Sequence, residues 1–161
     1  VSPFYCGALR IPVLEDGKKV GYVLRRTDGG EPKEVSAPGF KRSEYLYNLD
    51  SVVPHAKVFI VEGIFDCVAV AREGFTCVAS FGSHLSDVQI GKLLAKRPNK
   101  LYMMFDSDEA GIKGAQDATK RICHRERRPE LVRIVNLPEG KDADELDSKE
   151  LYMLLLPYVK A

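Results

Sequence analysis

Acidic side chains follow three of the short apolar runs in this sequence. They are Glu62 after residues 58–61, Asp106 and Asp108 after residues 101–105, and Asp142 and Asp144 after residues 132–137. If these runs are neighbouring parallel strands about 5 Å apart, their carboxyl ends bring the carboxylates to one edge of a sheet. Carboxylates packed so closely repel one another unless a divalent cation neutralises them. Hard oxygen ligands without a His or Cys cluster favour Mg²⁺ or Mn²⁺ over zinc.

Each of these acidic residues also has a simpler interpretation. An Asp that follows a strand often caps the next helix, which would explain Asp106 or Asp108 taken alone. Asp66 lies one helical turn beyond Glu62, and either supports that residue or interacts with the helix N-terminus. Three acidic strand ends in one chain together favour a metal site.

The elements that would position these residues alternate along residues 57–161. Short apolar, β-branched runs predict strands at 58–61, 76–79, 101–105 and 132–137. Segments of helical period predict helices at 64–73, 86–97, 109–125 and 148–159. This order indicates an α/β fold in which helices flank a parallel sheet.

The first 56 residues have a different character. Two runs, 8–14 and 19–25, surround the turn Asp16-Gly17 and predict a hairpin. Residues 27–43 are rich in Gly, Pro and charge, and predict surface loops with little regular structure. We therefore expect a small β-rich (α+β) subdomain with basic loops at 1–56 and a metal-binding subdomain at 57–161.

The composition bounds the class of protein. The 161 residues are 45% hydrophobic and 29% charged, as in a globular domain, and a net charge of +1 allows only a local basic or acidic site. No run approaches the roughly 20 apolar residues that cross a bilayer, so a cytoplasmic location without a membrane partner is expected. The chain does not begin with Met, which suggests a fragment.

The four cysteines form no CxxC pair, so we expect reduced, mostly buried thiols at Cys6, Cys67, Cys77 and Cys123.

The acidic motifs resemble the Toprim family, which is shared by bacterial primases, topoisomerases and some nucleases. Glu62-Gly63 and Asp106-Ser107-Asp108 are similar to its Glu-Gly and Asp-x-Asp motifs. Further segments resemble the bacterial DNA primases in particular. These segments are LYNL at 46–49, VEGIFD at 61–66, ASFGS at 79–83, FDSDEAG at 105–111 and LPEGKDAD at 137–144.

The resemblance to primases extends into the front segment. IPV at 11–13, VGY at 20–22, Arg25 and the Pro-Lys at 32–33 are similar to family motifs, so the resemblance covers essentially the whole chain. Val23 and Leu24 replace two family glycines, and Ser107 replaces the usual Gly between the aspartates. These departures would suit a phage or plasmid primase better than a housekeeping one.

The resemblance implies metal-dependent synthesis of short RNA primers on single-stranded DNA. Metal ions would lower the pKa of the attacking 3′ hydroxyl and offset the charge that grows on the phosphates. In this mechanism Asp106 and Asp108 would bind the metal directly. Glu62 would bind metal or transfer a proton, and Asp142 would be a ligand or an outer-shell residue. Arg25 and Lys33 would face the nucleotide phosphates or the template. Lys41 and Arg42, in the basic loops, could add positive charge for the triphosphate. Lys113, one turn into the following helix, and Lys141, beside Asp142, could also neutralise phosphate, although both could equally be solvated surface lysines.

Three other functions remain open. A Toprim nuclease would use the same carboxylates to direct water at a phosphodiester, but the front segments that resemble primases argue against it. A binding module without catalysis is disfavoured because no acidic position has been replaced, and a topoisomerase would need a tyrosine nucleophile, usually in another domain. The expected partners are nucleoside triphosphates and a single-stranded DNA template, with a replicative helicase contacted through regions outside this chain.

Overall fold

The computed structural model describes residues 7–160, which form two β-sheets and four α-helices. The three-stranded sheet is antiparallel in the order β1-β2-β3, and the four-stranded sheet is parallel in the order β5-β4-β6-β7. The strands are β1 (Leu9–Glu15), β2 (Lys18–Arg25), β3 (Glu34–Ser36), β4 (Lys57–Val61), β5 (Cys77–Ala79), β6 (Lys100–Met103) and β7 (Val132–Ile134). The helices are α1 (Ile64–Arg72), α2 (Asp87–Ala95), α3 (Glu109–Glu126) and α4 (Ser148–Lys160).

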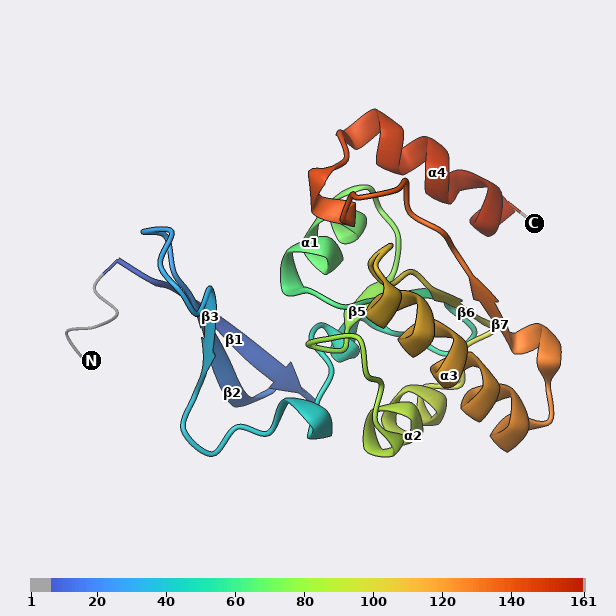
Figure 1. The fold of residues 1–161 in the computed structure, drawn as a ribbon. Helices are drawn as coiled ribbons and strands as arrows, with labels where there is room; N and C mark the ends of the chain where they lie inside the picture. The colour runs from blue at the N-terminus through green and yellow to red at the C-terminus, as the bar shows by residue number, and fades with distance from the viewer. Residues whose placement is uncertain (1–6, 161) are drawn as a thin grey trace.

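Helices cover both faces of the parallel sheet, with α1 and α4 on one face and α2 and α3 on the other (Figure 1). Successive side chains of a strand point to opposite faces, so a strand covered on both sides must be apolar throughout. In β4, Val58 and Ile60 belong to the core that includes residues of α2 and α3. Phe59 and Val61 belong to the core that includes residues of α1 and α4. The predicted α/β fold and the order of its strands and helices are confirmed.

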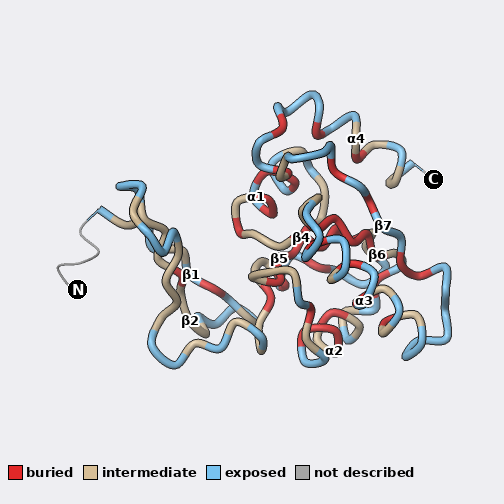
Figure 2. The backbone as a smooth tube through the Cα atoms, viewed as in Figure 1, coloured by how far each residue is buried: buried red, intermediate tan, exposed pale blue. Residues whose placement is uncertain are grey.

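The front sheet has little interior of its own, and most of its backbone is intermediate or exposed in burial (Figure 2). Its buried cluster consists of Val13 and Val23 packed with Ile64 of α1. The predicted hairpin is confirmed as β1 and β2. Residues 27–43 have little regular structure, as expected, and their one strand is the short β3, which pairs with β2 through Leu24 and Val35.

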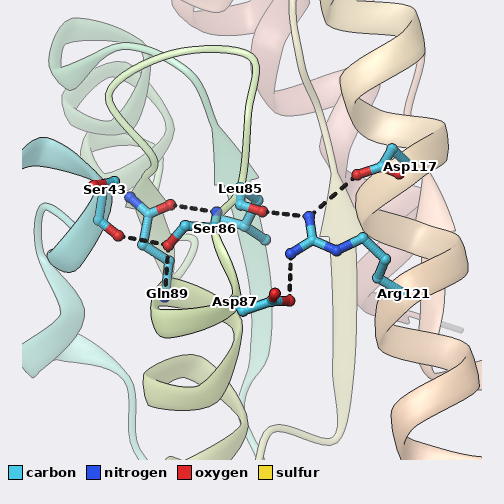
Figure 3. Close-up of polar contacts among 7 residues, drawn as sticks. All are labelled: Ser43, Leu85, Ser86, Asp87, Gln89, Asp117 and Arg121. Atoms are coloured by element: carbon cyan, nitrogen blue, oxygen red, sulfur yellow. Dashed lines mark hydrogen bonds and ion pairs between the residues drawn. The ribbon is translucent and has the colours of Figure 1, made fainter.

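A set of hydrogen bonds fastens the segment after β3 to helix α2 (Figure 3). Gln89 and Ser86 form a capping box at the start of α2, and the Ser86 hydroxyl also donates to the carbonyl of Ser43 at 2.5 Å. The buried Gln89 amide donates to the carbonyl oxygens of Arg42 at 3.1 Å and Tyr45 at 2.7 Å. These bonds hold the segment that carries Arg42 in a fixed place beside the parallel sheet.

Two further expectations concern cysteines and membranes. Cys67 and Cys77 are buried and Cys123 is partly buried, all three as free thiols, whereas Cys6 lies outside the described residues. Within residues 7–160, no helix is long and apolar enough to cross a membrane.

Candidate functional site

The first two acidic strand ends are joined by a hydrogen bond from backbone to carboxylate. Glu62 follows β4, and its Oε1 accepts a bond from the backbone N–H of Asp106, in the turn after β6, at 3.1 Å. Asp108 is the N-cap of α3, where its Oδ1 accepts from the N–H of Gly111 at 2.7 Å. The capping interpretation therefore holds for Asp108. Asp106 is not the N-cap of α3 and lies close enough to the neighbouring carboxylates for their charges to raise its pKa.

The third acidic segment, after β7, is tied to the other two. The N–H of Asp144 donates to Oδ1 of the buried Asp66 at 3.1 Å. The N–H of Gly140 donates to the hydroxyl of Ser107 at 3.0 Å. Ser107, where the family usually has Gly, thus joins the turn after β6 to the segment after β7.

Gly111 allows the turn after β6 to approach helix α3 closely. A Cβ at this position would lie 2.3 Å from the carbonyl oxygen of Asp106 and 2.8 Å from Oε1 of Glu62. Backbone cannot yield to such a contact as a flexible side chain can. The glycine is therefore required by the packing of Glu62 against the Asp106 turn.

The electrostatics of the cluster oppose full ionisation. The pKa of Asp106 is raised to about 7, first by burial and then by the charge of Glu62, with smaller contributions from Asp142, Asp66 and Asp108. The pKa of Asp66 is raised to about 6 and that of Glu62 is raised as well, in both cases mainly by burial. Carboxylates that resist ionisation in this way gain most from a bound cation.

The donors fit a hard divalent cation in chemistry but are not arranged as a ready coordination shell. Among residues 7–160, no three His, Cys, Asp or Glu side chains lie so that they could hold a metal ion together. One oxygen of Glu62 and one of Asp108 already accept backbone N–H groups. Glu62, Asp106 and Asp108 lie within electrostatic reach of one another, as the sequence predicts, yet their side chains would have to turn to share a cation.

A cleft of about 420 Å³ opens between this acidic cluster and the front sheet. Glu62, Asp106 and Asp142 line one side of it, together with Asp66 and Asp144. The front sheet and the segment after it contribute cations to the same lining, namely Arg25, Lys33 and Arg42. The cleft therefore places positive side chains opposite a group of carboxylates.

The cations of the cleft are positioned by side-chain contacts. Glu34 of β3 lies between two arginines, 3.4 Å from the guanidinium of Arg25 and 3.7 Å from that of Arg42. The Arg25 guanidinium also lies over the ring of Phe65, 5.1 Å from its centroid. An arginine held on an aromatic face keeps a fixed orientation while its remaining N–H donors stay available.

Eight residues are assigned from the sequence to metal, nucleotide or template binding, and the structure brings five of them together. Those that line the cleft are Glu62, Asp106, Asp142, Arg25 and Lys33. Asp108, Lys41 and Lys113 are absent from its lining, and Lys41 pairs with Glu44 at 3.0 Å on the surface. The sequence reasoning missed Glu34 and Phe65, because their roles depend on which elements become neighbours. A larger hollow of about 530 Å³ at the β7 edge shares Asp106 but has no Lys or Arg in its lining.

Comparisons with known proteins give the family context. Residues 59–147 match the Toprim-like family. The chain is similar to the DNA primases of Synechococcus elongatus, with 35% identity over 149 residues and 85% of this chain covered, and of Synechocystis sp., with 33% identity and 92% covered. It spans only 21% and 26% of the length of these two relatives.

Solved structures show the same likeness. The Escherichia coli primase catalytic core superposes with a TM-score of 0.80 at 27% identity, over 96% of this chain and 52% of that one. A DnaG primase catalytic domain bound to single-stranded DNA gives a TM-score of 0.81 at 26% identity, over 96% of this chain and 51% of that one. The likeness thus includes the front sheet as well as the parallel sheet.

Proposed function

The chain belongs to the Toprim-like family, and from this premise we propose that it is part of the catalytic core of a bacterial-type DNA primase. Its reaction would be the metal-dependent joining of ribonucleotides on a single-stranded DNA template. The observation that carries the proposal is the cleft in which Arg25, Lys33 and Arg42 face Glu62, Asp106 and Asp142. A site that holds both a triphosphate and a strand needs this combination of metal-binding and phosphate-binding groups.

The proposed roles follow from position and chemistry. Glu62, Asp106 and Asp108 would bind the metal, with Asp142 as a further or outer ligand. Mg²⁺ or Mn²⁺, when bound, would lower the pKa of the attacking hydroxyl and stabilise charge on the phosphates. Each carboxylate at the site would then be held ionised, despite the pKa of about 7 of Asp106 in the free protein.

The protein's own cations would position the substrate. Arg25 and Lys33 would contact the triphosphate or the template backbone, and Arg42 would do so from the segment that Gln89 fixes. For Arg25, binding of phosphate would replace its contact with Glu34, in which the two side chains are only partly exposed. Lys41 and Lys113 lie outside the lining of the cleft and would contact a strand that leaves it.

The proposed partners are a single-stranded DNA template and nucleoside triphosphates. A similar catalytic domain is known bound to single-stranded DNA, which supports the first. A replicative helicase would be contacted by regions outside this chain. We also propose the division into a front subdomain at 1–56 and a Toprim subdomain at 57–161, because the two sheets are built separately and meet across the cleft.

The rival function is a metal-dependent nuclease, and nucleotide binding distinguishes the two. A polymerising site should bind a nucleoside triphosphate in Mn²⁺ more tightly than the monophosphate, because each further phosphate contacts metal and cations. Isothermal titration of both nucleotides tests this, with Asp106→Asn as the control that should remove the metal-dependent binding. Equal or absent binding, together with metal-dependent nicking of plasmid DNA, would assign the site to a nuclease.

A further inference from the structure

A second charged surface lies at the amino ends of the parallel strands, whereas the acidic cluster lies at their carboxyl ends. Two loops that precede strands are joined there by backbone hydrogen bonds, from His55 N–H to the Arg97 carbonyl at 2.9 Å and from Asn99 N–H to the Ala56 carbonyl at 2.8 Å. The first loop leads into Lys57 at the start of β4 and the second into β6. Cations from both loops are therefore carried side by side on a rigid frame.

A third segment, between α3 and β7, completes this surface. Leu131 anchors it in the core with 1% exposure, while Arg128 before it and Arg133, the middle residue of β7, are exposed. The ammonium of Lys100 donates to the carbonyl of Glu130, which links the segment to the start of β6. All three segments precede strands, whereas Glu62 and the Asp106 turn follow strands.

The three segments enclose two adjoining hollows of about 250 and 370 Å³ that share Asn99 and Arg128. Five Lys and Arg side chains line them, which we call the basic edge: Lys57, Arg97, Lys100, Arg128 and Arg133. The carboxylates in the same lining are two, Glu126 and Glu130. Because the whole chain carries a net charge of only +1, positive charge has been separated to the edge opposite the acidic cluster.

Most of this charge is not consumed by internal ion pairs. Within residues 7–160, Arg97 and Arg133 take part in none of the ion pairs of the structure. Arg128 pairs with Glu130 at 3.1 Å, but the side chains are 47% and 62% exposed, so solvent screens the pair. The guanidinium groups therefore remain able to contact an anionic partner.

We propose that the basic edge binds the phosphate backbone of nucleic acid, as a second contact separate from the acidic cleft. Three of its five cations are arginines, whose planar groups match phosphate oxygens in pairs. Protein interfaces are anchored by exposed apolar or aromatic side chains, and no exposed large hydrophobic residue in the described chain lines these hollows. The choice of nucleic acid as the partner rests on the proposed function, whereas the charged surface itself does not.

The two contacts are far enough apart for strand length to separate them. The five residues of β4 alone span about 16 Å, at roughly 3.3 Å per residue. A strand of a few nucleotides can occupy the cleft without reaching the basic edge, and one of about 30 nucleotides can reach both. Only the longer strand should gain affinity from the basic edge.

Charge reversal on this chain tests the proposal. Binding of fluorescein-labelled single strands of about 30 and about 5 nucleotides is measured by anisotropy over a range of salt concentrations, for the wild type and Arg97→Glu/Arg133→Glu. The matched control is Lys18→Glu/Lys149→Glu, which makes the same change in net charge at exposed lysines outside the cleft and both hollows. Affinity of Arg97→Glu/Arg133→Glu for the long strand should fall about tenfold more than that of the control. The slope of log affinity against log salt concentration should decrease in magnitude by about 1.4, because two phosphate contacts are lost and each contributes roughly 0.7.

Other results would overturn the proposal. One is a long-strand affinity and salt slope equal to those of the control double variant. Another is tight binding of polyglutamate that Arg97→Glu/Arg133→Glu abolishes while DNA binding is unchanged, which would assign the surface to an acidic protein. A fall in melting temperature without loss of DNA binding would mean that Arg97 and Arg133 only stabilise the fold at the amino ends of the strands. Nucleotide binding in Mn²⁺, measured on the same variants, reports separately on the acidic cleft and hence on the proposed function.

Discussion

The two sheets hold their charged side chains in opposite ways. On the parallel sheet, Glu62, Asp66 and Asp108 accept hydrogen bonds from backbone N–H groups, so like charges are fixed by the chain itself. On the front side, Arg25 and Arg42 are held by a shared carboxylate, that of Glu34. Like charges need a scaffold that cannot relax, whereas opposite charges can be held by contacts that a ligand replaces. The backbone of the acidic side is therefore fixed, although its side chains must still turn to share a cation, and the basic side can exchange its partners.

The interior of the two sheets differs in the same direction. Two extensive apolar clusters cover both faces of the parallel sheet. The front sheet buries only Val13 and Val23 against Ile64, and the segment after it depends on hydrogen bonds to Gln89. Changes on the acidic side should therefore alter stability strongly, and changes on the basic side should alter binding with little effect on stability.

The largest expected effect is that of Gly111→Ala. The new Cβ would meet the backbone of Asp106 at 2.3 Å and the Glu62 carboxylate at 2.8 Å, so the turn after β6 must move. We expect a loss of about 2–3 kcal/mol in the free energy of unfolding, measured in urea. Mn²⁺ affinity should fall as well, because the displaced turn carries Asp106.

Gly91→Ala is the matched control for this change. Gly91 also lies within a helix, α2, but a Cβ there would meet nothing closer than the Arg125 guanidinium at 3.7 Å. Because Ala is the better helix former, this variant should gain about 0.5–1 kcal/mol. A loss of similar size in both variants would contradict the idea that the acidic turn is rigidly packed.

The next effect is a gain in stability from Asp106→Asn that depends on pH. The pKa of Asp106 in the folded chain is about 7, above its ordinary value of 3.8, so folding favours the protonated form. The stability that this group contributes is complete below pH 3.8 and is lost as the pH rises through 7. In metal-free buffer at pH 8 the variant should exceed the wild type by about 1–2 kcal/mol, after allowance for solvent screening.

Urea titrations at pH 4 and pH 8 check this prediction. The two proteins should differ least at pH 4, where the wild-type carboxyl is largely protonated in the folded state. Mn²⁺ should stabilise the wild type at pH 8 and leave Asp106→Asn unchanged. A constant difference between the proteins at both pH values would mean that neither burial nor the neighbouring carboxylates oppose ionisation of Asp106. Equal stabilisation of both proteins by Mn²⁺ would mean that Asp106 is not a metal ligand.

A smaller effect is expected from Ser107→Ala. The hydroxyl accepts the N–H of Gly140 at 3.0 Å near the surface, so its loss should cost about 0.5–1 kcal/mol. The segment after β7 would keep its hydrogen bond to Asp66 of α1 but lose its bond to the turn after β6, and hydrogen exchange of the Gly140 amide should increase. Unchanged exchange would show that this bond contributes nothing to the position of that segment.

The sequence predicts the parallel sheet more completely than the front sheet, for a physical reason. Continuous apolar runs identify buried strands, and the residues after them must lie at one edge, which is how Glu62 and Asp106 were found. Strand β3 has three residues, all of intermediate burial, so no periodic signal marks it. The roles of Glu34 and Phe65 depend on tertiary neighbours, and so does the hydrogen bond from the N–H of Asp144 to Asp66. None of these can be obtained from spacing along the chain.

The smallest expected effect on stability, and the sharpest test of the exchangeable side of the cleft, is that of Arg25→Ala. Its ion pair with Glu34 spans 3.4 Å between partly exposed groups, so the free energy of unfolding should change by about 0.5 kcal/mol. Affinity for a nucleoside triphosphate in Mn²⁺ should nevertheless fall about tenfold, because a charge-assisted contact to phosphate is lost. Arg10→Ala is the matched control, since Arg10 lies on β1 over the Tyr22 ring and outside the lining of the cleft. If isothermal titration gives equal affinities for the two variants, Arg25 does not contact the nucleotide. If Arg25→Ala instead destabilises the protein as much as Gly111→Ala does, both sides of the cleft are rigid scaffolds and the contrast between the sheets fails.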